Sequence, residues 1–386
     1  MNAVNATNVT GAVNATNVTG AAGATSVTGA VGAAGAPDVY HAGSRALQDL
    51  AGVRERADHV GRSLGRDIKP VAAAFLELQP LLIVGAAAPD TGRVWAAPLA
   101  GAPGFVRATG PGQMSVTTGP GQMSLTTGPG RPSLTTAPGR TPAAGPVPGA
   151  TAAGQPSVTA GAAGAAGAAG AGGELSPGGP LALALVTPGT RVGTLALDPR
   201  TRRRMRLNGR LRPTPRGFAV EADQVFANCP RYIQRRESFE LLGGRTPGLP
   251  RRTPELTSEQ VEFVESADTF FLATVHGAGA DVSHRGGNPG FVTVASPREL
   301  TWPDYPGNAM FLTLGNLRTD PRAGLLLLDW TTGTTLQLTG EAHTGFGPDG
   351  ARTVRFTVTE VLATEAAVPL RWSAPEYSPA NPGTAR

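Results

Sequence analysis

The sequence carries one arrangement of helix, strands and turns twice, and this duplication limits the possible folds more than any other feature. The segment 75–106 contains a helix end, a buried strand, a turn, a second strand and a Pro-Gly turn into Phe-Val, and the segment 263–292 repeats that order. Further along, 197–210 aligns with 328–341 at a constant offset of 131 residues. A third strand is expected after each aligned pair. We therefore predict two copies of one module.

Short strands joined by Gly/Pro turns favour a small barrel over a sheet built from strand–helix–strand units. Each copy has a helix in front of it. A continuous apolar stripe predicts one helix from Ser44 to the residue before Pro70, and Thr257 and Gln260 have the spacing of a capping box at the start of a second helix. Two copies in one chain can cover each other's strand edges, as the subunits of a homodimer do.

Two nine-residue repeats interrupt this pattern. One fills 1–37, and the other begins at Gly110 and passes into an Ala/Gly run. Such sequence buries too little apolar surface to offset its ordering entropy, so we predict disorder. The predicted organisation is listed by range: a disordered tail at 1–37, an N-terminal module at 38–250 with a disordered insertion at about 108–179, a C-terminal module at 251–372 and a disordered tail at 373–386.

Composition excludes several classes of function. The net charge of +5 comes almost entirely from arginine, and the only tight basic cluster, 202–204, is interpreted as a solvated strand or turn. Without basic residues interleaved with aromatic ones, nucleic-acid binding is not expected. Cys229 is the only cysteine, so no disulfide and no multi-cysteine metal site can form within the chain. We expect a cytoplasmic protein without a membrane span, signal peptide or metal site.

Four blocks in the second copy resemble the pyridoxamine 5′-phosphate oxidase-like family, which folds as a flavin-binding split barrel. The blocks are 267–275, 281–292, 307–324 and 336–341, with Ser-His-Arg-Gly-Gly at 283–287 and Gly-Asn-Leu at 315–317 as the more specific parts. The resemblance covers about 38–107 and 180–372. It implies a mainly β protein with flanking helices, in which two split-barrel modules form a tandem pseudo-dimer.

The resemblance also implies a site, because the family holds FMN between two barrels. Transferred by position, the residues beside the flavin are Ser283, His284, Arg285, Thr313, Asn316, Arg322 and Gln337. Arginine gives bidentate, charge-assisted bonds to phosphate, and hydroxyl and amide groups add neutral donors. Structural alternatives stay open for these positions: an exposed strand residue for Arg285, a packed ring for His284, a turn cap for Asn316 and an ordinary strand residue for Gln337.

The first copy has the apolar segment 95–99 opposite the Ser-His-Arg block, so we predict one flavin site per chain. The leading hypothesis is an FMN-dependent oxidoreductase with an unknown small-molecule substrate or electron donor, distinct from a true pyridoxamine phosphate oxidase. The alternatives are a non-catalytic flavin, deazaflavin or haem module and a structural pseudo-dimer that binds nothing. The chain is expected to be monomeric or a homodimer. Cys229 is either an inert buried residue or, beside Arg231, a thiolate that meets flavin or substrate.

Overall fold

The computed structural model describes residues 38–118, 125–126, 133–134, 179–227, 229–277 and 279–383. The predicted tail at 1–37 and most of the predicted insertion lie outside these ranges. In the described ranges, no helix is both long enough and apolar enough to cross a lipid bilayer. The structure is mainly β with few helices, which confirms the predicted fold class of split-barrel modules with flanking helices.

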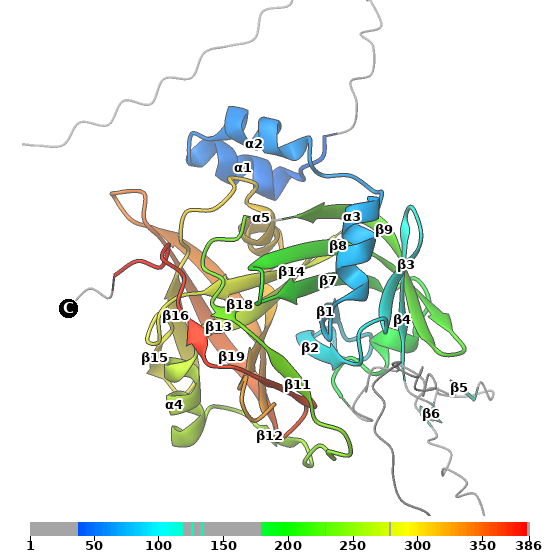
Figure 1. Ribbon diagram of the computed structural model, residues 1–386. Helices are drawn as coiled ribbons and strands as arrows, with labels where there is room; N and C mark the ends of the chain where they lie inside the picture. Colours follow the sequence, from blue (N-terminus) through cyan, green and yellow to red (C-terminus); the bar gives the residue numbers. More distant parts are fainter. Residues whose placement is uncertain are drawn as a thin grey trace, which may run out of the picture. The chain divides into compact units, whose positions relative to one another are not determined.

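The strands in the described ranges form two main antiparallel sheets (Figure 1). The first, in the order β2-β1-β7-β8-β9-β4-β3, consists of β1 (Leu81–Ala87), β2 (Val94–Ala100), β3 (Val106–Gly110), β4 (Gln113–Thr117), β7 (Arg191–Asp198), β8 (Arg203–Thr214) and β9 (Gly217–Ala227). The second, in the order β14-β13-β17-β18-β19-β16-β15, consists of β13 (Thr269–His276), β14 (Gly279–Gly286), β15 (Thr293–Ser296), β16 (Glu299–Pro303), β17 (Arg322–Leu328), β18 (Thr335–Phe346) and β19 (Arg352–Thr364), with β12 (Arg251–Thr253) beside β19.

The two sheets have the same strand order when β1 is matched with β13, β2 with β14 and so on to β9 with β19. Each also has a bulge at the same place, after Asn208 in β8 and after Thr339 in β18. The next residue is glycine in both, and a Cβ on Gly209 or Gly340 would lie 1.9 Å from a backbone oxygen of the facing strand. Only glycine fits such a bulge. The two bulges are 131 residues apart, which is the offset found in the sequence.

The strand β4 lies where the sequence analysis expected the insertion. It is formed by the first unit of the second nine-residue repeat, and it pairs with β9. Met114 and Val116 alternate with polar residues, so both fall on the inner face of the sheet, where they are buried. The predicted start of the insertion at about residue 108 is therefore wrong. Beyond β4, the short strands β5 (Leu125–Thr126) and β6 (Ser133–Leu134) pair with each other.

Among the described residues, five α-helices and one 3-10 helix flank the sheets: α1 (Ala42–Leu50), α2 (Arg54–Gly61), α3 (Pro70–Glu77), η1 (Ala184–Val186), α4 (Ser258–Ser266) and α5 (Leu312–Thr319). The single helix predicted from Ser44 to Pro70 is wrong. The backbone turns at Gly52, whose φ of +63° is readily adopted only by glycine, and α1 ends before it. The capping box predicted for Thr257 and Gln260 is confirmed at the start of α4.

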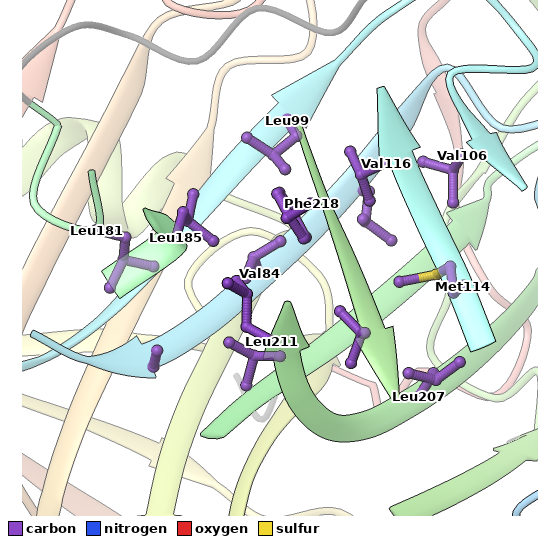
Figure 2. Packing of buried hydrophobic residues seen from close by; sticks show 14 of the residues in the cluster. Val84, Leu99, Val106, Met114, Val116, Leu181, Leu185, Leu207, Leu211 and Phe218 are labelled. Carbon is purple, nitrogen blue, oxygen red and sulfur yellow. The ribbon is translucent and has the colours of Figure 1, made fainter. Parts of the chain in front are cut away.

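The central strands are buried on both faces, and their alternation divides the apolar residues between two layers. In β1, Val84 (Figure 2) and Leu82 enter the core of the first module, whereas Ile83 packs into an apolar cluster between the two sheets. In β13, Phe270 enters the core of the second module and Phe271 enters the shared cluster. We call this shared cluster the seam. Successive side chains of a strand point to opposite faces of the sheet, so the same strands supply residues to the module cores and to the seam.

Glycines allow the strands to approach closely at the seam. A Cβ on Gly193 would lie 2.6 Å from the backbone of Asp281 in β14, and a Cβ on Gly324 would lie 2.6 Å from the backbone of Trp95 in β2. Gly193 and Gly324 are again 131 residues apart. Each module thus places a glycine of one strand against the second strand of the other, which gives the seam approximate two-fold symmetry.

The chain between the modules and the chain's C-terminal segment lie side by side. Strand β10 (Arg235–Arg236) pairs with β21 (Pro375–Glu376), and β11 (Phe239–Leu241) pairs with β20 (Leu370–Trp372). The backbone N–H of Ser378 donates to Gln234 Oε1 at 2.8 Å. The predicted disorder of the C-terminal tail is therefore wrong for 373–383, because these residues pair with the connecting segment.

Candidate functional site

A pocket of about 120 Å³ opens where β8 of the first module meets β14 of the second. Its walls come from four places in the chain: β8 supplies Arg204 and Arg206; the connecting segment supplies Cys229, Arg231 and Tyr232; β14 supplies His284, Arg285 and Gly286; and the second module adds Phe291, residues 303–305 and 307–314, and Arg352. Neither module alone encloses it.

The imidazole of His284 has a defined protonation state. Arg204 Nη1 lies 2.9 Å from His284 Nδ1, and because a guanidinium can only donate, Nδ1 accepts. Burial, followed by the charges of Arg204, Arg285 and Arg206, holds the pKa of His284 well below its ordinary value. The ring is therefore neutral, and its proton is on Nε2. This buried nitrogen has no hydrogen-bond partner among the described residues.

Arg204 has no carboxylate partner within the described part of the chain. Besides His284, its guanidinium donates from Nη2 to the carbonyl oxygen of Cys229 at 2.9 Å. Burial, together with the neighbouring charges of Arg206 and Arg285, lowers its pKa to about 9. The group remains a cation at neutral pH and lacks a counter-charge.

Arg206 belongs to a buried polar cluster that crosses the seam. Its Nη1 donates to Asp281 Oδ2 at 2.9 Å, and the amide of Asn208 donates to Asp281 Oδ1 at 3.1 Å. Thr313, at the start of α5, donates to the same carboxylate at 3.2 Å. Asp281 is only 3% exposed. The carboxylate thus ties the first module to β14 and α5 of the second.

A second carboxylate holds the other side of the pocket. Asp304 forms ion pairs with Arg285 and with Arg352, whose Nε lies 2.9 Å from Asp304 Oδ2. The Arg352 guanidinium also lies over the Phe311 ring, 5.2 Å from its centre. The four arginines Arg204, Arg206, Arg285 and Arg352 face only two carboxylates at this site, and the exposed Arg231 adds a further positive charge. The pocket therefore carries an excess of positive charge.

Four buried donors at the pocket have no acceptor among the described residues. They are His284 Nε2 and the Nε atoms of Arg204, Arg206 and Arg285. An unsatisfied buried polar group costs about 1–3 kcal/mol, and more when it is charged. Four such groups around one positively charged pocket are the arrangement expected of a binding site for an anion with several acceptor oxygens.

The backbone around the pocket is strained. Tyr232, Ala309 and Phe311 line it, and all three have a positive φ, of 65°, 64° and 53°. Left-handed backbone at a residue other than glycine costs of the order of 1 kcal/mol or more and concentrates at functional sites. Phe311 is the N-cap of α5, and no side chain caps this helix. The N–H groups of its first turn lie at the pocket wall, where they favour an anion.

Helices α1 and α2 hold the loop that carries these strained residues. Ser44 Oγ donates to Phe311 O at 3.3 Å, Gln48 Nε2 to Met310 O at 3.0 Å, and Arg56 Nη2 to Gly307 O at 3.3 Å. All three acceptors are backbone carbonyls of the pocket wall. In Figure 1, α1 lies beside α5, and α2 lies next to α1. The helices that precede the first module in sequence thus position a loop of the second.

Three of the seven predicted site residues, His284, Arg285 and Thr313, line the pocket. Ser283 is buried and donates to Leu272 O at 3.4 Å. Arg322 is exposed and bonds to Asp320 and to the carbonyl of Gly92. These two side chains and those of Asn316 and Gln337 do not line the pocket, and flavin contact by any of the seven stays a prediction.

Asn316 connects secondary-structure elements behind the pocket wall. Its Nδ2 donates to Thr274 Oγ1 at 2.9 Å, and its Oδ1 lies 2.9 Å from His41 Nε2. The side chain therefore ties α5 both to β13 and to the segment that begins α1. In this position Asn316 supports the pocket wall from outside.

Gln337 lies at the seam, at the end opposite the pocket, where the approximate two-fold symmetry relates it to Arg206. Its Nε2 donates to Ala96 O at 2.7 Å, opposite the apolar strand β2. The residue 131 positions earlier is Arg206, which faces β14 and lines the pocket. Gln337 and Arg206 thus occupy matching strand positions at the two ends of the seam, and only Arg206 lines the pocket.

Five residues of the candidate site were not predicted from the sequence: Arg204, Arg206, Asp281, Asp304 and Arg352. The interpretation of 202–204 as solvated is wrong for Arg204, whose Nε is buried. A signal for Arg206 was present, because the aligned segments match it with the predicted site residue Gln337. No motif marks Asp304 or Arg352, which meet only when β16 and β19 pair.

The pH dependence of stability tests the neutral state of His284. Burial is the largest cause of the lowered pKa of His41, His276 and His284, so the unfolded chain binds more protons than the folded one below about pH 6.5. Stability should be constant above that pH and fall below it. His284→Asn keeps an acceptor for Arg204 but cannot titrate, and it should reduce the acid slope by up to about 1.4 kcal/mol per pH unit. Denaturant unfolding between pH 5 and 7.5 measures this, and an unchanged slope would contradict a neutral, buried His284.

Comparison with known proteins identifies part of the chain. Residues 256–361 match the family model described as pyridoxamine 5′-phosphate oxidase. No curated protein matches the chain. Among solved structures, a candidate pyridoxamine 5′-phosphate oxidase from Lactobacillus delbrueckii is 21% identical, covering 28% of this chain and 94% of its own, with a TM-score of 0.23. An FAD-binding protein from Mesorhizobium loti is 14% identical, covering 30% of this chain and 98% of its own, with a TM-score of 0.22.

The fold and the site define a split-barrel protein with a positively charged pocket between two modules. The matched segment carries α4, α5 and most of the second sheet, including the pocket residues of β14. The second module is therefore similar to the pyridoxamine 5′-phosphate oxidase-like family over residues 256–361. Since both TM-scores are low, the assignment rests on the sequence match.

Proposed function

We propose that the pocket binds the phosphate of flavin mononucleotide and that the protein is a flavin-dependent oxidoreductase with a small-molecule substrate or electron donor. The observation that carries this proposal is a set of four N–H donors, on residues that line one pocket, that have no partner in the described part of the chain, together with the match of residues 256–361 to this family. A phosphate monoester is doubly charged at neutral pH and offers three acceptor oxygens. It would satisfy these donors and neutralise the excess positive charge.

The residues present fit such a group. Arg204, Arg206 and Arg285 offer charge-assisted hydrogen bonds, and the neutral His284 offers an N–H from Nε2. The uncapped start of α5 adds backbone N–H groups and the positive end of a helix dipole. All these donors are held by other contacts, so little further ordering is needed when the anion binds.

The flavin, when bound, would supply the hydride or electron transfer, and the protein would bind, orient and shield it. Arg204 holds His284 in one tautomer, and Asp304 holds Arg285 and Arg352 in place. Tyr232 donates to Pro306 O at 3.0 Å, and its ring lies 5.1 Å from the Tyr305 ring, so this aromatic pair covers part of the pocket and limits access of water.

One such site per chain is proposed. The equivalent place at the other end of the seam has Ala97, Pro98 and Leu99 at the positions of Ser283, His284 and Arg285, as the strand registers align them. These side chains offer no donor to a phosphate. The first module would thus complete the site of the second without having its own, as a monomeric pseudo-dimer located in the cytoplasm.

Flavin titration of the purified protein tests the proposal. The wild type is expected to take up FMN and turn yellow. Arg204→Met should weaken FMN binding about 10- to 150-fold, which corresponds to a lost charged hydrogen bond of about 1.5–3 kcal/mol. The matched control is Arg210→Met in the same strand, where the side chain is 55% exposed and pairs with Asp223. Its FMN affinity should equal that of the wild type.

Two results would oppose the proposal. A colourless wild type that takes up no added FMN would exclude a flavin site, and equal FMN affinity of Arg204→Met and wild type would exclude this pocket. A yellow protein that neither oxidises reduced nicotinamides nor passes electrons to oxygen would favour the non-catalytic flavin-binding module over the oxidoreductase.

A further inference from the structure

Cys229 lies in the wall of the pocket, and neighbouring contacts hold it there. It is half-buried and is the only cysteine of the chain. Its carbonyl oxygen accepts the hydrogen bond from Arg204, and three residues further on the Tyr232 hydroxyl bonds to the backbone of Pro306. The segment 229–232 is thus fixed at both ends, and the thiol belongs to the same pocket as the arginines.

An independent observation shows that this pocket is built for a ligand. His284 and Arg206 line the pocket and are only 5% and 7% exposed, and each has a buried nitrogen that lacks a hydrogen-bond partner among the described residues. Arg231, two residues after Cys229, is exposed and adds a positive charge beside the thiol. A small anion attracted to these groups would therefore come into contact with the sulfur.

We propose that Cys229 is a modification site for small disulfides that carry carboxylate groups, and that the mixed disulfide closes the pocket to phosphate. The thiol first loses its proton to solvent. The thiolate then attacks one sulfur of the disulfide R–S–S–R, a new Cys229–S–S–R bond forms, the old S–S bond breaks, and R–S⁻ leaves and takes up a proton. Cys229 is oxidised and the departing sulfur is reduced, so the step needs no other reagent.

The positive charge of the pocket favours anionic disulfides, and it also explains why the attached group would block phosphate binding. A cleft of one sign of charge raises the local concentration of an oppositely charged reagent, by 10- to 1,000-fold in rate in favourable cases, and salt weakens this effect. Once attached, the carboxylate of R lies beside the donors that we assign to phosphate. The modification would thus regulate the proposed flavin site, and this last step rests on the proposed function. A free thiol reductant reverses it.

The experiment compares two disulfide probes on the full-length protein. 5,5′-Dithiobis(2-nitrobenzoate) carries two carboxylates, and 4,4′-dithiodipyridine is neutral. The ratio of their second-order rate constants is measured for the protein and for N-acetylcysteine. At low salt, the protein ratio is expected to be at least about ten times that of N-acetylcysteine. It should fall in high salt and match the free thiol after unfolding in guanidinium chloride.

Single-residue variants and competition by phosphate test whether the charge of the pocket causes the raised ratio. Arg231→Gln removes the exposed positive charge beside the thiol and should therefore lower the ratio severalfold. Arg203→Gln is the matched control, since Arg203 is exposed and does not line the pocket, and it should leave the ratio unchanged. Inorganic phosphate should slow the anionic probe more than the neutral one. Protein labelled with the anionic probe should lose FMN binding and regain it with dithiothreitol.

The outcomes separate this inference from the proposed function. A protein ratio equal to that of N-acetylcysteine, or one unaffected by phosphate, overturns the inference even when FMN binds normally. A raised ratio that phosphate suppresses, in a protein that binds no FMN, supports the thiol site and removes the flavin proposal. Full FMN binding by the labelled protein overturns the regulatory step.

Discussion

Replacing Asp281 by alanine is expected to lower the free energy of unfolding by about 3–5 kcal/mol, because it leaves a buried charge without its partner. Asp281 is 3% exposed and accepts hydrogen bonds from Arg206, Asn208 and Thr313. Those donors come from β8 and from α5, so the carboxylate is shared by both modules. Its loss should therefore weaken the seam as well as the pocket. Denaturant unfolding of the flavin-free protein measures the difference.

A surface ion pair in the same part of the chain provides the control. Asp223 pairs with Arg210 in solvent, with exposures of 33% and 55%, so Asp223→Ala should cost no more than about 1 kcal/mol. The double variant Arg206→Met with Asp281→Leu removes both charges and should recover much of the loss, because burial of the pair is itself costly. Equal stability of Asp281→Ala and Asp223→Ala would show that the carboxylate does not hold the seam.

The duplicated scaffold could be predicted because strands follow local rules. The segments 197–210 and 328–341 keep the same alternation and the same bulge glycine, and both form the strands that the alignment expected. The errors arose where local composition and tertiary pairing disagree. Met114 and Val116 lie in a low-complexity repeat. Because they are two residues apart, both side chains can face the core when this segment pairs with β9. Pairing with β9 in the folded protein, and not the local composition, therefore determines that this segment is a strand.

The site could be predicted only in part, because its residues meet through the seam. His284 and Arg285 were found from the motif in β14. Arg206 was not, because its role depends on which module faces which. The repeat that reveals the modules does not by itself show that position 206 faces β14 while position 337 faces β2. In the pseudo-dimer, residues at the seam of one module contact the other module. The sequence of one module alone does not show which residues of the other module they will contact.

This asymmetry would allow one chain to hold the single proposed site in a two-fold scaffold. At one end of the seam β8 presents Arg206 to Asp281, and at the other β18 presents Gln337 to a backbone carbonyl beside Trp95. Trp95 occupies the position that Asp281 has in the second module. In a homodimer both ends would be identical. Fusion of the copies allows one end to keep charged groups while the other becomes apolar packing.

Replacing Gly315 by valine is expected to separate α1 from α5 and to weaken ligand binding in the pocket. A Cβ on Gly315 would lie 2.3 Å from Ser44 Oγ and 2.6 Å from the Ser44 backbone nitrogen, so the α1 backbone must move. Overpacking of this kind costs about 1–3 kcal/mol. The movement would also pull on the bonds from Ser44 and Gln48 to the carbonyls of Phe311 and Met310. Thermal unfolding should show the loss of stability, and FMN titration a severalfold weaker affinity.

Two companion variants show which part of the effect belongs to the contact between helices. Gly243→Val places a side chain where no atom lies within 4 Å, so its stability and FMN affinity should stay close to the wild type. Gln48→Ala removes the buried donor to Met310 O without crowding α1. It should weaken FMN binding in the same direction as Gly315→Val, because both free the strained loop. If Gly315→Val lost stability but kept full FMN affinity, and Gln48→Ala did the same, then α1 would stabilise the second module without positioning its pocket.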